Sequence, residues 1–146
     1  MAVVLVVGLN DETCLEYLRA QGFIVRGPVS PEATGKLLDD TTPDLVIIEV
    51  SGSQLDAATF IRELRFRLDD ATSIIVISGL RRQEDRVALN AAGADFFLPK
   101  SASPSDVAYE MKRALILRRS GRRLGWNWQD AVAVAVSTER RRRTTS

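Results

Sequence analysis

Four short runs of strand-forming apolar residues constrain the fold of this chain most strongly. Each is nearly continuous in apolar character, and together they occupy residues 2–7, 45–50, 73–78 and 94–98. Such runs are typical of strands that are covered on both faces, as in a parallel sheet. The stretches between them carry apolar residues at helical spacing, as at Ile61, Leu64 and Leu68. Strand and helix are therefore expected to alternate along the chain.

A fifth and weaker strand is expected at residues 23–25, directly after Gly22. The sequence Ser30-Pro31-Glu32 then predicts the start of a helix, with a capping hydroxyl, a proline in the first turn and an early acid. The total becomes five strands and five helices. Five βα units with right-handed crossovers predict an α/β fold with a doubly wound, five-stranded parallel sheet, whose site lies at the carboxyl ends of the central strands.

One carboxylate, Glu49, interrupts the apolar run at residues 45–50. A strand interior rarely keeps a charge without a partner or a task, because an unpaired buried carboxylate is costly. Glu49 and Ser78 both fall at the carboxyl end of a predicted strand, and Lys100 follows the last strand. We therefore expect these residues to face one crevice, together with the loop that follows the first strand.

Composition narrows the chemistry that the chain can perform. Its 146 residues suit one domain, and a hydrophobic content of 45% is enough for a core. The sequence has no histidine and a single cysteine, Cys14, so it lacks the commonest general base, an internal disulfide and most ligands for soft metals. Cys14 lies on an apolar helix face and is expected to be a packed thiol.

No apolar run approaches the roughly 18 residues that a membrane span requires. The first apolar run is also not preceded by a basic residue, as it would be in a signal peptide. The expectation is therefore a cytoplasmic protein without a membrane partner.

The net charge of +1 conceals an asymmetry between two parts of the chain. Residues 1–117 contain 12 Lys or Arg and 17 Asp or Glu, which gives 12 − 17 = −5. Residues 118–146 contain 8 Arg and 2 acidic residues, which gives 8 − 2 = +6. The chain is thus expected to consist of a domain at 1–119 and a basic, Trp- and Arg-containing tail at 120–146.

Three motifs follow one another in a characteristic order: PDLVIIEVSGSQLDAATFIREL at 43–64, IIVISG at 74–79 and NAAGADFFLPKS at 90–101. In this order they resemble the third strand, loop and helix, the fourth strand, and the fifth strand with its lysine in the receiver domain of bacterial two-component response regulators. The resemblance covers about residues 1–119 and implies the receiver, or flavodoxin-like, fold.

The resemblance also implies roles for three residues. In this family, a hydroxyl that ends the fourth strand and a lysine after the fifth strand contact the oxygens of the phosphoryl group. Ser78 matches the hydroxyl and Lys100 matches the lysine, while Phe97 matches the aromatic switch residue of the fifth strand.

The family's phosphorylation chemistry depends on two further positions. Receivers accept the phosphoryl group on an aspartate at the end of the third strand, with magnesium held by this residue and by an acidic pair after the first strand. Here the acceptor position holds Glu49, and the acidic pair falls on Gly8 and Leu9, which offer no oxygen ligands to a hard cation. The magnesium site is therefore expected to be missing, and we expect no cofactor, no metal and no catalytic residue.

Two interpretations of Glu49 remain open at this point. An ion pair with Lys100 would resemble part of the contact set that phosphorylation creates and would hold the domain in an active-like state. Alternatively, the same pair is structural and fills an inactive site. A shifted alignment would bring Asn10 or Asp11 into the site, but both fit better as the cap and first turn of a helix that begins near Asp11.

In this family the fourth helix, fifth strand and fifth helix form the usual docking or dimer surface. The residues that we place on this surface besides Phe97 are Arg81, Arg82, Arg86, Tyr109 and Lys112. An ordinary solvated helix face is the alternative for each charged residue.

The tail combines Trp126 and Trp128 with arginine runs. An exposed Trp and Val patch tends to associate, so we expect the tail to pack on its own domain or on a second copy in a homodimer. Binding of nucleic acid through arginine and tryptophan is the alternative for the tail.

The sequence therefore predicts a receiver-like signalling module that works without phosphorylation, through contacts with a protein partner, and that is not an enzyme. Two alternatives remain: a true phosphoacceptor response regulator with an unusual site at Glu49, and a nucleic-acid-binding protein that uses the Arg-rich tail.

Overall fold

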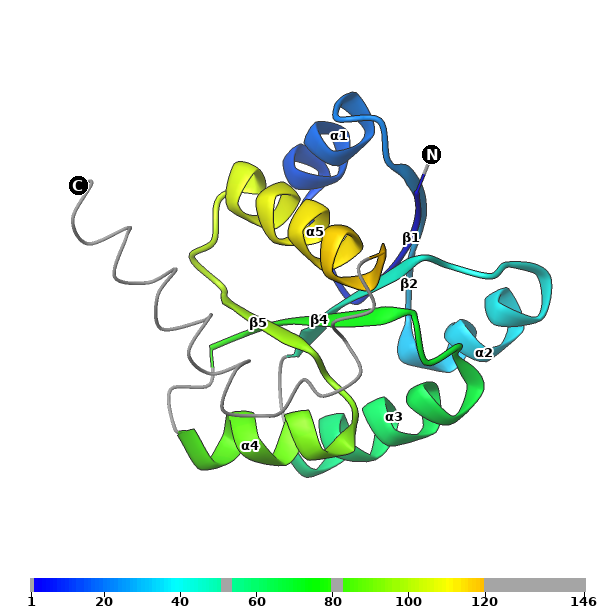
Figure 1. Cartoon of the computed structure of the whole chain (residues 1–146), viewed down its shortest axis with the longest axis vertical. Coiled ribbons are helices and arrows are strands. Elements are labelled where there is room, and N and C mark those ends of the chain that lie inside the picture. The colour runs from blue at the N-terminus through cyan, green and yellow to red at the C-terminus, as the bar shows by residue number, and fades with distance from the viewer. Residues whose placement is uncertain (1, 51–53, 80–82, 120–146) are drawn as a thin grey trace.

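The structure is a computed structural model that describes residues 2–50, 54–79 and 83–119 (Figure 1). A five-stranded sheet has the strand order β2-β1-β3-β4-β5, and every neighbouring pair is parallel. The strands are β1 (Val3–Val7), β2 (Ile24–Val29), β3 (Leu45–Val50), β4 (Ser73–Ser78) and β5 (Phe96–Pro99). The helices are α1 (Glu12–Ala20), α2 (Pro31–Asp40), α3 (Gln54–Arg67), α4 (Gln83–Ala92) and α5 (Pro104–Arg119). The predicted doubly wound α/β fold is confirmed.

The central strands are buried because helices cover both faces of the sheet. Figure 1 shows α1 and α5 on one side, with α3 and α4 on the other. Leu45 and Ile47 of β3 join the core cluster beneath α1 and α5, whereas Val46 and Ile48 join the cluster beneath α3 and α4. This alternation explains the continuous apolar runs, since each face of the strand contacts a helix.

Local polar signals begin the helices as predicted. Asp11 is the N-cap of α1, and its carboxylate accepts a hydrogen bond from the Cys14 N–H at 3.2 Å. Ser30 caps α2 by accepting from the Ala33 N–H at 3.3 Å, and Pro31 is the first residue of that helix. The cap predicted at Ser30 is confirmed, and the helix predicted to begin near Asp11 starts at Glu12 with Asp11 as its cap.

The strand predicted at residues 23–25 was too short. β2 runs from Ile24 to Val29 and includes Gly27 and Pro28, which are usually strand breakers. An edge strand tolerates a proline because only one side of the strand needs its N–H groups for pairing, and β2 forms one edge of this sheet.

None of the helices in the described ranges is both long enough and apolar enough to cross a membrane. Residues 120–146, for which a docking tail was predicted, lie outside the described residues.

Candidate functional site

The residues predicted to face one crevice lie at the same edge of the sheet. Glu49 is the penultimate residue of β3, Ser78 ends β4, and Lys100 follows β5. The register pairs Val50 with Ser78, and Ser78 with Pro99, so the ends of these strands are level. The expected convergence of the strand ends is therefore present.

Glu49 is half-buried and lies on the face of β3 that α1 and α5 cover. Its neighbours on that face, Leu45 and Ile47, belong to the core cluster that includes Cys14 of α1. The negative charge of Glu49 acts on the Cys14 thiol and helps to raise its pKa. The carboxylate is thus electrostatically coupled to the first turn of α1.

Cys14 is a packed thiol, as predicted, with only 4% of its surface exposed. Burial is the largest cause of its raised pKa, followed by the charges of Asp11 and Glu49. Low polarity and neighbouring carboxylates both disfavour the thiolate. Cys14 is therefore poorly suited to act as a nucleophile or a metal ligand.

The two positions that match the family's acidic pair have other roles in this chain. Gly8 is exposed with φ +77°, and its N–H donates to Val29 O at 3.0 Å, so it makes a turn that favours glycine. Leu9 is 6% exposed and belongs to the core cluster with Cys14. Within the described ranges, no group of three or more His, Cys, Asp and Glu residues could hold a metal ion.

Glu49 and Lys100, both described by the structure, form no ion pair with one another. The expected pair is therefore not formed. β4 separates β3 from β5, and two strand spacings amount to about 10 Å. The Lys100 stem instead runs along Gly79, since a Cβ at Gly79 would lie 3.8 Å from Lys100 Cδ.

Comparisons with known proteins concern the fold of the chain. No protein-family model matches the chain. The transcriptional regulatory protein PrrA of Mycobacterium leprae (strain TN) is 29% identical over 104 residues, which cover 71% of this chain and 43% of PrrA. The chain therefore spans less than half the length of this relative.

Solved structures share the fold at low identity. The CheY-like response regulator receiver domain protein from Methanospirillum hungatei JF-1 aligns with a TM-score of 0.72 at 16% identity, over 83% of this chain and 98% of that protein. The chain has the fold of a CheY-like receiver domain. An atypical orphan response regulator, described with a phosphorylation-independent regulatory mechanism, aligns with a TM-score of 0.66 at 21% identity, over 77% and 94% of the two chains.

The predicted docking surface is only partly described by the structure. Arg81 and Arg82 lie outside the described residues. Arg86 is half-buried in α4, and Phe97 is 7% exposed in the core cluster beneath α3 and α4. Tyr109 is 52% exposed on α5.

Lys112, which the sequence analysis also placed on the docking surface, contacts the C-terminal end of α1. Its ammonium donates to the Gln21 side chain at 2.9 Å, and Gln21 is the C-cap of α1. The sequence analysis overlooked Ile116, which is 63% exposed. Ile116 lies seven residues after Tyr109, so both are on one side of α5. This spacing in the sequence could have revealed it.

Proposed function

We propose that this receiver domain is a signalling module that operates without phosphorylation and acts through contacts with a protein partner. The observation that carries the proposal is the end of β1, where a turn glycine and a buried leucine occupy the positions of the acidic pair. Magnesium neutralises the charge that develops during phosphoryl transfer, and it requires oxygen ligands. Gly8 and Leu9 supply none from their side chains.

Two further observations support the proposal. Asp11, the nearest carboxylate along the chain, caps α1, and this role requires it to point at the helix N-terminus. Among the solved structures with this fold is an orphan regulator that is described as phosphorylation-independent. In this proposal Glu49 is a fixed charge near α1 and not a phosphoryl acceptor.

The alternative is a phosphoacceptor site at Glu49, and one observation favours it. Ser78 and Lys100 both occupy the positions of the residues that contact phosphoryl oxygens, at the ends of β4 and β5. Two of the family's contacts would thus be in place.

Incubation with a small phosphodonor separates the two proposals. With magnesium and acetyl phosphate, or with beryllofluoride, we expect no stoichiometric adduct by intact mass and no shift of Glu49 resonances by NMR. A magnesium-dependent adduct that disappears in Glu49→Gln would establish the alternative.

A matched variant tests whether Asp11 substitutes for the acidic pair. Asp11→Ser keeps a capping side chain and removes the charge. We expect this variant and the unmodified chain to behave alike with every phosphodonor. An adduct that forms only while Asp11 is present would show that Asp11 takes part in a metal site.

A further inference from the structure

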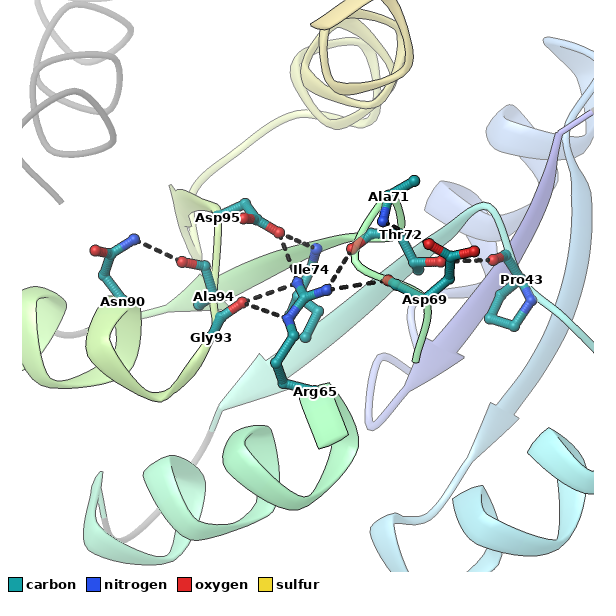
Figure 2. A network of polar contacts seen from close by, with 10 residues as sticks. All are labelled: Pro43, Arg65, Asp69, Ala71, Thr72, Ile74, Asn90, Gly93, Ala94 and Asp95. Atoms are coloured by element: carbon teal, nitrogen blue, oxygen red, sulfur yellow. Dashed lines mark hydrogen bonds and ion pairs between the residues drawn. The ribbon is translucent and has the colours of Figure 1, made fainter. Parts of the chain in front are cut away.

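A network of polar contacts lies at the amino ends of β4 and β5, at the opposite end of the sheet from the candidate site (Figure 2). Its centre is Arg65 in the last turn of α3. Nη1 donates to Thr72 O at 2.7 Å, while Nη2 donates to Gly93 O at 2.9 Å and to Asp95 Oδ2 at 2.8 Å. The Arg65 and Asp95 side chains are only 18% and 15% exposed, so water screens this ion pair weakly.

These contacts join segments that are far apart in the sequence. Thr72 precedes β4, Gly93 follows α4, and Asp95 precedes β5. The Asp95 carboxylate also accepts the Ile74 N–H of β4 at 2.9 Å. One planar guanidinium thus holds the end of α3, the entry to β4 and the turn between α4 and β5 in a fixed relative position.

The turn between α4 and β5 also packs directly on the Arg65 stem. Gly93 has φ +132°, and a Cβ there would lie 2.8 Å from Arg65 Cβ. Asn90 closes the same turn by donating from Nδ2 to Ala94 O at 2.7 Å, as Figure 2 shows. Packing and hydrogen bonds therefore fix the turn from two sides.

β5 is also held by its side chains, because Phe96, Phe97 and Leu98 are buried in the core. It contains four residues and lies at the edge of the sheet, where β4 is its neighbour among the described strands. Loss of the Arg65 contacts would leave the start of this edge attached through β4 pairing and two hydrogen bonds between Asp95 and Ile74. The Asp95 N–H donates to Ile74 O at 2.9 Å, and the Asp95 carboxylate accepts the Ile74 N–H at 2.9 Å. The network is thus a principal polar anchor for this edge.

We infer that Arg65 is a positioning residue for the α4 and β5 part of the docking surface. It fixes the end of α4 and the start of β5 to the sheet and thereby holds that part of the surface in one arrangement. The inference rests on the proposed function, in which the surface contacts a partner without a phosphoryl group to order it.

Hydrogen exchange of the intact chain tests the inference, with Arg65→Gln compared with Arg67→Gln. Arg67 is a matched control because it lies in the same helix turn and forms an exposed ion pair with Asp39 at 2.7 Å, on α2. In Arg65→Gln we expect the amides of Gly93, Ala94 and Asp95 to exchange about tenfold faster or more, the range for loss of a shielded charge-assisted bond. Amides in β1 and β3 should change much less.

Arg67→Gln should leave exchange in both regions unchanged. Arg65→Lys should fail to restore protection, since one ammonium cannot span the carbonyls of Thr72 and Gly93 with the geometry of a guanidinium. If Arg65→Gln does not fold, Asp95→Asn decides, because it nearly keeps the side-chain volume, removes the charge and replaces one acceptor oxygen with an amide donor.

Two results would overturn the inference. Amide exchange that becomes faster to the same extent in β1, β3 and β5 would mean that the network contributes only to global stability. Unchanged exchange in all three strands would mean that the network has no measurable effect. The proposed function fails by a different observation. A magnesium-dependent adduct at Glu49 would overturn it while leaving the local exchange pattern around Gly93 intact.

Discussion

At the scale of single residues, Glu49 shows how a charge is tolerated within an apolar strand. The side chain is half-buried and lies on the face covered by α1, where its charge acts on Cys14 in the first turn of that helix. The amino end of a helix carries a partial positive charge that favours nearby anions. Glu49 forms no ion pair with Lys100, and the residue stays partly open to solvent, which lowers the cost of keeping a charge within the strand.

This geometry predicts additive effects at Glu49 and Lys100. Lys100 is exposed and forms no ion pair with Glu49, so Lys100→Ala should change the free energy of unfolding by no more than about 0.5 kcal/mol. The double variant Glu49→Gln with Lys100→Ala should equal the sum of the single changes within about 0.5 kcal/mol in urea unfolding. A coupling energy well above this value would mean that the two side chains meet in solution.

The raised pKa of Cys14 predicts how the stability of the fold changes with pH. The folded protein holds the thiol proton more tightly than the unfolded chain, so this group stabilises the fold below the pKa of the unfolded thiol, about 8.5. This contribution to stability is lost as the pH rises from the pKa of the unfolded thiol through the higher pKa of the folded protein. Urea unfolding between pH 7 and 10, in reducing buffer, should show a smaller loss of stability for Cys14→Ala than for the unmodified chain.

The raised pKa of Cys14 also leads to a separate prediction about how fast its thiol reacts. Because the charge of Glu49 helps to raise the pKa of Cys14, Glu49→Gln should lower it and increase the thiolate fraction. Glu49→Gln should therefore react faster with iodoacetamide at pH 8.5 than the unmodified chain, at matched folded fraction. Equal rates would place the Glu49 carboxylate too far away to act on the thiol.

At the scale of elements, the turn between α4 and β5 depends on the absence of a side chain at Gly93. Gly22 is the matched control, because it also has a positive φ, +95°, but a Cβ there would meet no atom within 4 Å. Gly22→Ala measures backbone strain alone, which costs about 1–3 kcal/mol. Gly93→Ala adds a contact at 2.8 Å with Arg65 Cβ, and we expect a further loss of about 1–3 kcal/mol by chemical denaturation.

Similar losses of unfolding free energy in the two variants would mean that α3 and the turn move apart easily enough to make room for the added methyl group. In that case the packing of Gly93 on Arg65 contributes little, and the guanidinium contacts alone fix the turn.

The sequence predicted the elements well because their signals are local. Apolar runs located four strands, and capping side chains at Asp11 and Ser30 located the starts of two helices. The length of β2 was missed because Gly27 and Pro28 act as breakers in isolation, and only the sheet shows that they lie on an edge.

Contacts across the fold were harder to predict than elements. The convergence of Glu49, Ser78 and Lys100 at one edge followed from strand order, but an ion pair requires side chains to meet across an intervening strand. Lys112 was assigned from helix position alone, and its contact with Gln21 joins residues 91 positions apart. The Arg65 network was missed for the same reason, since its partners Gly93 and Asp95 become neighbours only when β5 pairs with β4.

At the scale of the whole molecule, charge is distributed unevenly along the chain. Residues 1–117 carry −5 and residues 118–146 carry +6, from 12 − 17 and 8 − 2. The tail begins directly after α5, which presents Tyr109 and Ile116 on its exposed side. An oppositely charged domain is thus within reach of the tail, either on the same chain or on a second copy.

Attraction between exposed charges is weak and is screened by salt. Burial of apolar area in the tail adds about 25 cal/mol per Å², which salt does not screen. Trp126, Trp128 and the valines at 132, 134 and 136 supply such area. We therefore predict that the tail packs on a neighbouring copy and favours a homodimer that persists at high salt.

Truncation after Ser120 tests this prediction, because it removes the apolar residues and the arginine run together. The shortened chain should keep the receiver fold, sediment as a monomer where the intact chain sediments as a dimer, and retain exchange protection in the core strands. A second variant, with Trp126 and Trp128 both changed to Ala, keeps every tail charge and should weaken the dimer at high salt, where apolar contacts dominate. If the intact and truncated chains sediment as the same species, with equal exchange protection throughout residues 1–117, the tail makes no such contact.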